Sequence, residues 1–301
     1  IEPEGLETDE MYIQGMSSSL PEDVQRDFYH SIEGLENIVI TRPAYAIEYD
    51  CIDPLELKLN LESRSIEKLF CAGQFNGSSG YEEAAAQGLM AGINAHLAIN
   101  GKEPFVLARN EAYIGVLIDD LVTKGTNEPY RIMTSRAEYR LLLRQDNADN
   151  RLTAKSYEIG LASEERFNRL KSKQEEVARE IDRLKSVIPT VAETNSYLEK
   201  INSSLVDGKI SLADLLKRPE VTYENLQEID KERPEISEHA RAQVSVEIKY
   251  QGYIKKQIQQ VEKFKKLEKM VIPKGFDYES VKGLSNIAIS GLMYGQPETI
   301  G

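Results

Sequence analysis

Residues 72–88 read AGQFNGSSGYEEAAAQG, and this segment governs the fold expected for the first part of the chain. The apolar run from Leu69 to Ala72 leads into it and reads as a strand. A helix is expected to follow from about Tyr81 to Leu97. Strand, loop and helix in this order are typical of one unit of an α/β layer.

The loop inside this segment has features of a ligand-binding turn. Three glycines allow the backbone to approach a partner that side chains would keep away: Gly73, Gly77 and Gly80. Ser79 and Glu82 match the S-x-x-E capping box, which predicts that the helix begins near Ser79. A helix N-terminus directed out of a glycine loop stabilises partial negative charge, either on a phosphate or on a carbonyl. The glycine spacing matches neither the dinucleotide fingerprint nor the P-loop, so an ordinary turn without a ligand remains an alternative.

Side chains around the loop favour a cofactor. Three amides are placed where they can hydrogen-bond a polar ligand: Gln74, Asn76 and Gln87. Ala84, Gly88 and Gly92 share one helix face, which predicts tight packing of that face against a sheet. From the residues alone, the segment is therefore interpreted as a cofactor loop.

Flanking patterns divide the chain into an α/β part and a helical part. Further strands are expected at 38–40, 46–49 and 55–61, with proline-containing breaks between them. Apolar stripes at helical spacing run from Phe167 to Ile188 and from Tyr250 to Val271 and suit an antiparallel helix pair or bundle. The alternation from Val244 to Tyr250 also fits a strand, but helix is preferred because no partner strand lies nearby in sequence. The expected domains are 1–155, α/β, and 156–301, α-helical.

Composition limits the classes of protein to consider. The 301 residues predict two domains, and 41% hydrophobic with 29% charged residues is the balance of a soluble globular protein. No apolar run approaches the roughly 18 residues that span a bilayer, and no secretory leader is expected. The first residue is Ile1, and Pro297 to Ile300 read as the opening turn of a further helix, so both ends read as cuts in a longer protein.

Cysteine and histidine usage gives no metal site. Cys51 and Cys71 are too few for a disulfide framework, which fits a reducing cytoplasm. His30, His96 and His239 are scattered without metal-ligand spacing. We therefore expect no bound metal.

An arginine cluster interrupts a chain whose formal net charge is −13. The cluster is the best candidate for contact with nucleic-acid phosphates: Arg131, Arg136, Arg140 and Arg144, with Arg151 beyond it. A helix would place three of these arginines on one face, whereas a strand would turn Tyr139 inward and Arg140 outward, and the sequence leaves both open. Ion pairs with Asp146 and Asp149 are the alternative role. A second basic run, Lys255 to Lys269, reads mainly as a solvated helix face.

Residues 72–88 resemble a segment of a known enzyme family. AGQFNGSSGYEEAAAQG is similar to a flavin-contacting segment of the MnmG family, also called GidA, whose members modify the wobble uridine of tRNA. Five further segments resemble the family: Glu2 to Tyr12, Arg42 to Asp50, Tyr113 to Thr153, Val246 to Gln257 and Gly275 to Ser285. The similarity covers nearly the whole chain.

The resemblance implies a glutathione-reductase-like FAD-binding domain followed by a helical domain that docks a partner and tRNA. It implies flavin contacts at Gln74, at the loop from Asn76 through Gly77 to Gly80, and at Tyr81 and Glu82, with the helix directed at the pyrimidine edge of the flavin ring. Glu82 and Glu83 complicate this, because carboxylates in the first turn satisfy the helix dipole themselves. The five arginines would contact tRNA. No catalytic residue is assigned, since neither cysteine lies in a segment that matches the family's catalytic cysteines.

The activity implied by the resemblance needs more than this chain. Family members act with a GTPase partner, MnmE, and install a (carboxymethyl)aminomethyl group at carbon 5 of the wobble uridine. They use FAD, NADH, a folate and glycine or ammonium, and they form homodimers that join the partner in a heterotetramer. The family's dinucleotide fingerprint and NADH-binding insertion precede the first residue here, so the chain alone is expected to be inactive. A non-catalytic helical docking module is the main alternative, and an unrelated flavoprotein reductase is a weaker one.

Overall fold

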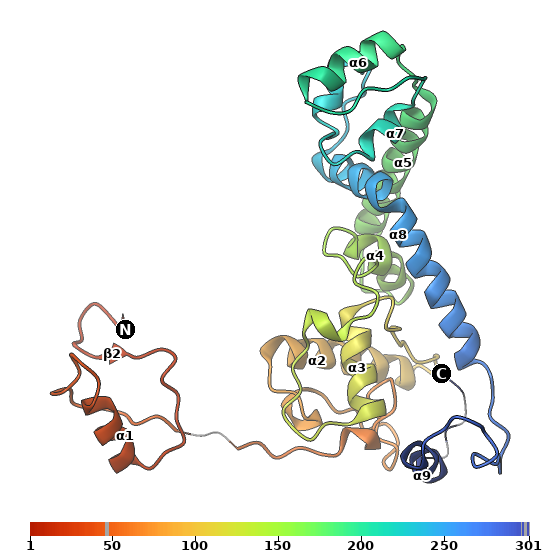
Figure 1. Ribbon diagram of the computed structural model, residues 1–301. Helices are drawn as coiled ribbons and strands as arrows, with labels where there is room; N and C mark the ends of the chain where they lie inside the picture. The colour runs from red at the N-terminus through yellow and green to blue at the C-terminus, as the bar shows by residue number, and fades with distance from the viewer. Residues whose placement is uncertain (46–47, 296, 298–299, 301) are drawn as a thin grey trace.

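The computed structural model describes residues 1–45, 48–295, 297 and 300. Among these residues the fold is mostly helical, with one small sheet in which β1 (Glu2–Pro3) pairs antiparallel with β2 (Met11–Tyr12). The sheet lies with α1 (Glu22–His30) in an N-terminal segment that stands apart from the rest of the chain (Figure 1). No helix within the described ranges is both long enough and apolar enough to cross a membrane.

A central body is built around α2 (Tyr81–Ile99) and α3 (Tyr113–Lys124). Short 3-10 turns at Pro54–Glu56 and Gly73–Asn76 pack against these two helices. The body has its own apolar core, whose most deeply buried members are Leu57, Leu61, Met90, Leu117 and Leu121. The observed α2 confirms the helix predicted from Tyr81 to Leu97.

The helices from α4 to α8 form a tall column above the central body (Figure 1). Its elements are α4 (Ala148–Glu158), α5 (Glu164–Ser186), α6 (Val191–Lys200), α7 (Leu212–Leu216), a 3-10 turn at Asn225–Glu228 and α8 (Glu238–Glu268). The last helix, α9 (Asn286–Gly295), lies outside the column, at the lower edge of Figure 1. The Ser163 hydroxyl caps α5 by accepting a hydrogen bond from the Arg166 backbone N–H. Both long helices predicted from the apolar stripes are confirmed, and they pack on each other while running in opposite senses along the column. The expected domain boundary, between residues 155 and 156, falls inside α4.

A second apolar core fills the upper part of this column, and its fully buried members include Leu184, Tyr197, Leu198, Leu212, Leu215, Leu216 and Tyr223. Residues 244–250 lie within α8, which confirms the preference for helix over strand. Their alternating apolar residues do not form a strand because the helix buries Val244 and Ile248, four residues apart, on one face.

An ion cluster is buried beside this second core. Arg183 donates to both oxygens of Glu180 at 2.7 and 2.8 Å and to both oxygens of Asp230 at 2.5 and 2.9 Å. The Tyr223 hydroxyl adds a 2.9 Å hydrogen bond to Glu180. Glu180 and Asp230 are only 2% and 3% exposed. Hydrogen bonds to the two carboxylates raise the pKa of Arg183 although burial opposes its charge.

Three of the strands predicted in the first part are wrong: 38–40, 55–61 and 69–72. Residues 38–40 have no regular structure, and the segment 55–61 begins in a 3-10 turn and makes an isolated bridge from Leu57 to Ser63. The run from Leu69 to Ala72 makes a single bridge, from Phe70 to Glu62. An extended segment becomes a strand only when a neighbour pairs with it along its length, and here the pairing between 61–63 and 69–71 stops at an isolated bridge. The expected α/β layer is therefore not formed among the described residues.

Two predictions fall partly outside the described residues. Ala46 and Ile47 belong to the strand expected at 46–49, and Glu298 and Thr299 belong to the helical turn expected at the end of the chain.

Two details predicted for α2 are also wrong. The helix begins after Gly80 without any side-chain cap, so Ser79 and Glu82 form no capping box. Gly88 and Gly92 lie on an exposed face with open space around them instead of packing on a sheet. The buried face instead combines apolar side chains, such as Met90, with polar ones whose hydrogen bonds are satisfied. Asn94, for example, donates to the Phe105 carbonyl and accepts from the Phe105 N–H.

Candidate cofactor loop and arginine surface

The glycine loop leads directly to the N-terminus of α2 and lies against the segment around Tyr130. Gly77 adopts the left-handed region, with φ of 86°, and its carbonyl accepts a 2.8 Å hydrogen bond from the Tyr130 N–H. The Tyr130 carbonyl in turn accepts a 3.3 Å hydrogen bond from the Ser79 N–H. Ser78 and Tyr130 thus form a parallel bridge that joins two segments about fifty residues apart.

The amides expected to bind a ligand mostly hold the loop together. The Asn76 amide donates to the Cys71 carbonyl and to Gln87 Oε1, each at 2.8 Å. Gln87 donates to Ser78 Oγ at 2.7 Å, and both amide side chains are fully buried. Gln74 is partly exposed and donates to the Asp50 carbonyl at 3.0 Å. Asn76 and Gln87 are therefore structural, and Gln74 alone of the three remains at the surface.

The exposed part of the site is the first turn of α2. Tyr81 is 93% exposed and Glu82 is also exposed. Because α2 has no side-chain cap, its first-turn N–H groups are left for an acceptor outside the helix. Glu83 is buried, and its Oε2 has no hydrogen-bond partner within the described part of the chain. Two carboxylates in one turn disfavour a phosphate, so an uncharged acceptor such as a flavin carbonyl fits this turn better.

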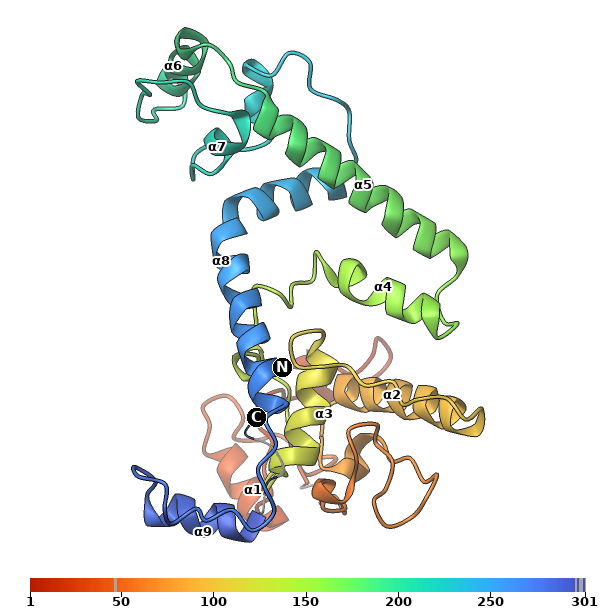
Figure 2. The same ribbon diagram turned by 90° about the vertical axis from the view of Figure 1, so that its right-hand side faces the viewer.

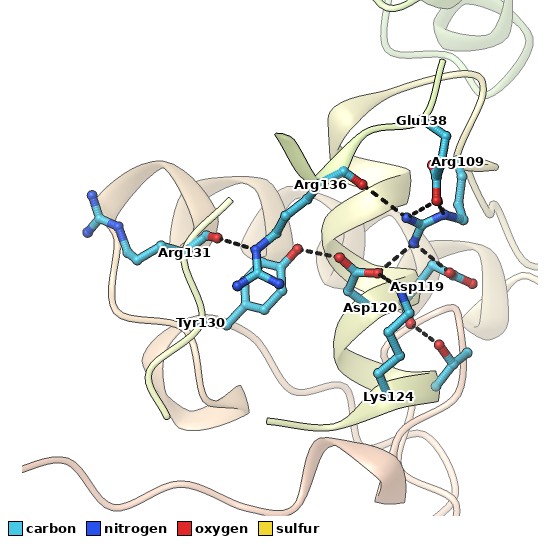
Figure 3. Close-up of polar contacts among 9 residues, drawn as sticks. Arg109, Asp119, Asp120, Lys124, Tyr130, Arg131, Arg136 and Glu138 are labelled. Atoms are coloured by element: carbon cyan, nitrogen blue, oxygen red, sulfur yellow. Dashed lines mark hydrogen bonds and ion pairs between the residues drawn. The ribbon is translucent and has the colours of Figure 1, made fainter. Parts of the chain in front are cut away.

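A network centred on Arg109 lies next to the loop, and sequence reasoning missed it (Figure 3). Arg109 bonds the carboxylates of Asp119 at 2.8 Å, Asp120 at 2.7 Å and Glu138 at 2.6 Å. Asp120 also accepts from Lys124 at 2.6 Å and from the Tyr130 hydroxyl at 2.8 Å. Only the pair of Asp120 and Lys124 could have been found from sequence, because side chains four residues apart meet on one face of a helix. The other partners are distant in sequence and carry no such signal.

Ionisation in this network is fixed by its contacts. Burial opposes the charge of Asp120, but hydrogen bonds from Lys124, Tyr130 and Arg109 hold its pKa below the ordinary value. Burial and the bond to Asp120 raise the pKa of Tyr130. Both shifts favour a charged Asp120 that accepts a hydrogen bond from a neutral Tyr130 hydroxyl.

Three of the predicted arginines lie at the surface. Arg131, Arg136 and Arg140 are exposed. Arg136 stacks over the Tyr130 ring, 4.3 Å from its centroid, and donates to the Arg131 carbonyl at 2.9 Å. The segment is neither the helix nor the strand considered from sequence, because a 3-10 turn at Thr134–Arg136 is followed by irregular turns. The guanidinium groups of these three residues can reach an external phosphate.

The other two predicted arginines are committed within the chain. Arg144 pairs with Asp146 at 3.0 Å and donates to the Leu141 carbonyl, which is the alternative role considered from sequence. Arg151 donates to the carbonyls of Glu111 and Arg144. Burial and the nearby charge of Arg144 lower the pKa of Arg151. The expected partner Asp149 instead pairs with Lys173 at 2.8 Å.

A groove of about 1250 Å³ is lined by residues of α5, α7 and α8 and of the segment that leads into α4. Figure 2 shows how these helices are arranged. Its floor is largely apolar and includes Ile181, Ile210, Ile248 and Ile254. Its rim carries five basic side chains against two acids: Arg144, Lys185, Lys209, Lys217 and Lys255 against Asp214 and Glu247. The groove is thus a locally basic, apolar surface in an acidic chain.

The cysteines and histidines have no site in common. Cys51 is exposed and Cys71 is buried, and burial raises the pKa of the Cys71 thiol. Within the described residues no group of three or more histidine, cysteine or acidic side chains is placed to hold a metal ion.

Comparisons with known proteins identify relatives along the whole chain. Residues 1–103 match the family model described as glucose inhibited division protein A. Residues 164–258 match the tRNA modifying enzyme MnmG/GidA C-terminal helical domain, and residues 260–301 match the MnmG/GidA C-terminal helical bundle.

Individual relatives agree with the family models. The chain is 60% identical over its full length to the tRNA uridine 5-carboxymethylaminomethyl modification enzyme MnmG of Alkaliphilus metalliredigens, and 58% identical to that of Caldicellulosiruptor saccharolyticus. It covers 48% of each relative, so it spans about half the length of the curated relatives that it matches. The structure of Aquifex aeolicus GidA superposes with a TM-score of 0.78 at 44% identity, over 99% of this chain and 47% of that one. Three family models, relatives matched along the whole of this chain and a solved structure all agree. The chain therefore belongs to the MnmG/GidA family.

Proposed function

We propose that the chain carries flavin-contacting and RNA-contacting parts of a tRNA uridine-modifying enzyme. One observation carries the proposal. The uncapped N-terminus of α2 emerges from a glycine loop that is hydrogen-bonded to a segment with exposed arginines. A site for an electron-rich ring and a site for phosphates therefore adjoin, which suits a flavoenzyme acting on RNA.

The proposed roles follow the accessibility of each residue. The first-turn N–H groups of α2, beginning at Tyr81, would hold a carbonyl at the pyrimidine edge of FAD, and the helix dipole would stabilise negative charge there. Gln74 and the backbone from Gly77 to Gly80 would line the same edge. Asn76 would shape the loop without touching the cofactor, and Glu82 would lie at the rim. FAD supplies the redox chemistry when it is bound.

The fuller activity extends the proposal to the longer relatives. They would act with the GTPase MnmE as homodimers within a heterotetramer, and would use FAD, NADH, a folate and glycine or ammonium to install the (carboxymethyl)aminomethyl group on the wobble uridine. The NADH site would lie outside this chain, and the 301 residues alone would be inactive. In that assembly residues 1–155 would complete the FAD-binding domain, and residues 156–301 would dock the partner and tRNA.

Proline at position 81 is expected to weaken FAD binding about two- to tenfold, the worth of one hydrogen bond. Proline removes the first helical N–H yet is well tolerated at the first helical position, and Gly80 already has the extended backbone that proline requires. Absorbance or fluorescence titration of the chain with FAD measures the effect.

Two matched variants separate the lost N–H from other changes. Tyr81→Ala removes the ring but keeps the N–H, and Glu164→Pro places proline at the start of α5. Both should bind FAD like the unaltered chain. If the unaltered chain does not bind FAD, the proposed cofactor role is wrong.

Exchange of exposed arginines for glutamine is expected to weaken tRNA binding and to reduce its salt dependence. Each lost phosphate contact lowers the slope of log affinity against log salt by about one. Arg131→Gln and Arg136→Gln should each show this change, measured by fluorescence anisotropy of labelled tRNA at several salt concentrations. Arg169→Gln is the control, because Arg169 is an exposed arginine on α5 that pairs with Glu165. Equal slopes in all variants would contradict an RNA role for the surface.

A second function, a non-catalytic docking module, is favoured by the groove beside α8. Its isoleucine floor and basic rim suit an acidic amphipathic helix of a partner protein better than a polar RNA backbone. Flavin binding distinguishes the two functions, since a docking module has no use for a cofactor.

A further inference from the structure

Tyr130 contacts both halves of the proposed site. Its backbone N–H and carbonyl bond the glycine loop at Gly77 and Ser79. Its ring lies under the Arg136 guanidinium at 4.3 Å, and its hydroxyl donates to Asp120 at 2.8 Å. Tyr130 is 3% exposed, so these contacts are made inside the protein. One buried residue therefore fixes the position of the loop relative to the arginines.

Glu83 makes a second connection between the same two segments. The Ile132 N–H donates to Glu83 Oε1 at 2.8 Å, and the Arg131 guanidinium lies 3.7 Å from the same oxygen. Glu83 stands in the first turn of α2, three residues after Gly80. Glu83 thus joins the N-terminus of α2 to the backbone next to Arg131.

The arginine segment has little regular structure of its own. Between Tyr130 and the turn at Thr134–Arg136, the chain forms neither helix nor strand. It is held by its contacts with Tyr130 and Glu83 and by Arg109, which donates to the Arg136 carbonyl at 3.2 Å. A ligand that orders one segment therefore reduces the entropy cost of ordering the other, which makes two ligands bind with positive cooperativity.

We propose that Tyr130 is a positioning residue that couples a flavin at the N-terminus of α2 to RNA phosphates at Arg131 and Arg136. This inference rests on the proposed function. Each ligand should raise the affinity for the other by the same factor, because coupling free energies are reciprocal. The arrangement would place the backbone of the bound RNA at a fixed distance from the flavin edge.

The test is a two-ligand binding cycle on the chain. The affinity for a labelled, unmodified tRNA is measured with and without saturating FAD, and the affinity for FAD with and without tRNA. We expect both affinities to rise about fivefold or more, the low end of usual couplings. Amide hydrogen exchange at residues 130–137 should slow when FAD alone is added.

Variants then test the route of the coupling. Tyr130→Leu removes the ring and hydroxyl but keeps the backbone bonds and the Glu83 link, and should reduce the coupling factor by about twofold or more, the low end of interaction energies between residues in contact. Tyr130→Phe keeps the ring under Arg136 and should retain at least part of the coupling, which guards against a folding defect in the leucine variant. Arg169→Gln is the control and should keep the full factor.

The outcomes are distinguishable. If FAD binds but changes neither tRNA affinity nor exchange at 130–137, the coupling is wrong and the proposed function stands. Coupling that persists undiminished in folded Tyr130→Leu overturns the role of Tyr130. If FAD does not bind at all, the proposed function fails and the coupling fails with it.

Discussion

Replacing Arg183 by methionine is expected to destabilise the upper helical core by about 3–5 kcal/mol, the usual cost of removing one partner from a buried ion cluster. The side chain neutralises Glu180 and Asp230 together, and both carboxylates are almost fully buried. Methionine would leave two adjacent negative charges without a cation. Urea unfolding followed by circular dichroism measures the loss.

The neighbouring arginine on α5 provides the control. Arg179 is exposed and bonds only to the Glu175 carbonyl among the described residues, so Arg179→Met should change stability by less than about 0.5 kcal/mol. Adding Glu180→Gln and Asp230→Asn to Arg183→Met should restore part of the loss, because the uncompensated charge is then removed. A loss below about 1 kcal/mol in Arg183→Met would place this cluster with surface ion pairs and contradict the expectation.

Gly115→Ala is expected to destabilise the central body by about 3 kcal/mol, the upper end for overpacking. A Cβ at this position in α3 would lie 2.4 Å from the Leu107 carbonyl oxygen and 2.5 Å from that of Ala108. Both obstacles are backbone atoms, so no side-chain rotation relieves the clash. Thermal unfolding of the variant and of the unaltered chain gives the difference.

Gly88→Ala is the matched control for this substitution. Gly88 also lies within a helix, but a Cβ there meets nothing within 4 Å. Alanine should stabilise α2 by about 1 kcal/mol, because glycine costs about that much in a helix interior. If both variants behave alike, close backbone approach is not what requires glycine at position 115.

The helices could be predicted from sequence, whereas the strands could not. The apolar periodicity of α5 and α8 repeats over many turns, and the bonds that form a helix lie within the segment itself. The segment 55–61 has strand-like composition, but its structure depends on which other backbone lies beside it. That information is not contained in a local pattern, and turns prevail here.

The candidate site was predictable in its parts but not in its connections. The glycines and the arginine cluster stand out in the sequence, whereas the bond between Gly77 and Tyr130 joins segments that share no pattern. Asn76 and Gln87 were expected to contact a ligand because the same amide side chains that bind ligands also hold loops together. Burial distinguishes the two roles, and burial follows only from the fold.

The first turn of α2 also constrains how this family can vary. A Cβ at position 80 would lie 1.6 Å from Glu83 Oε2, so Gly80 and Glu83 share one volume. A sequence that gains a side chain at position 80 must therefore shorten or redirect the residue at position 83 and lose its bond to the Ile132 N–H. Homologues that carry a side chain at position 80 should therefore lack glutamate at position 83 more often than homologues that keep glycine there.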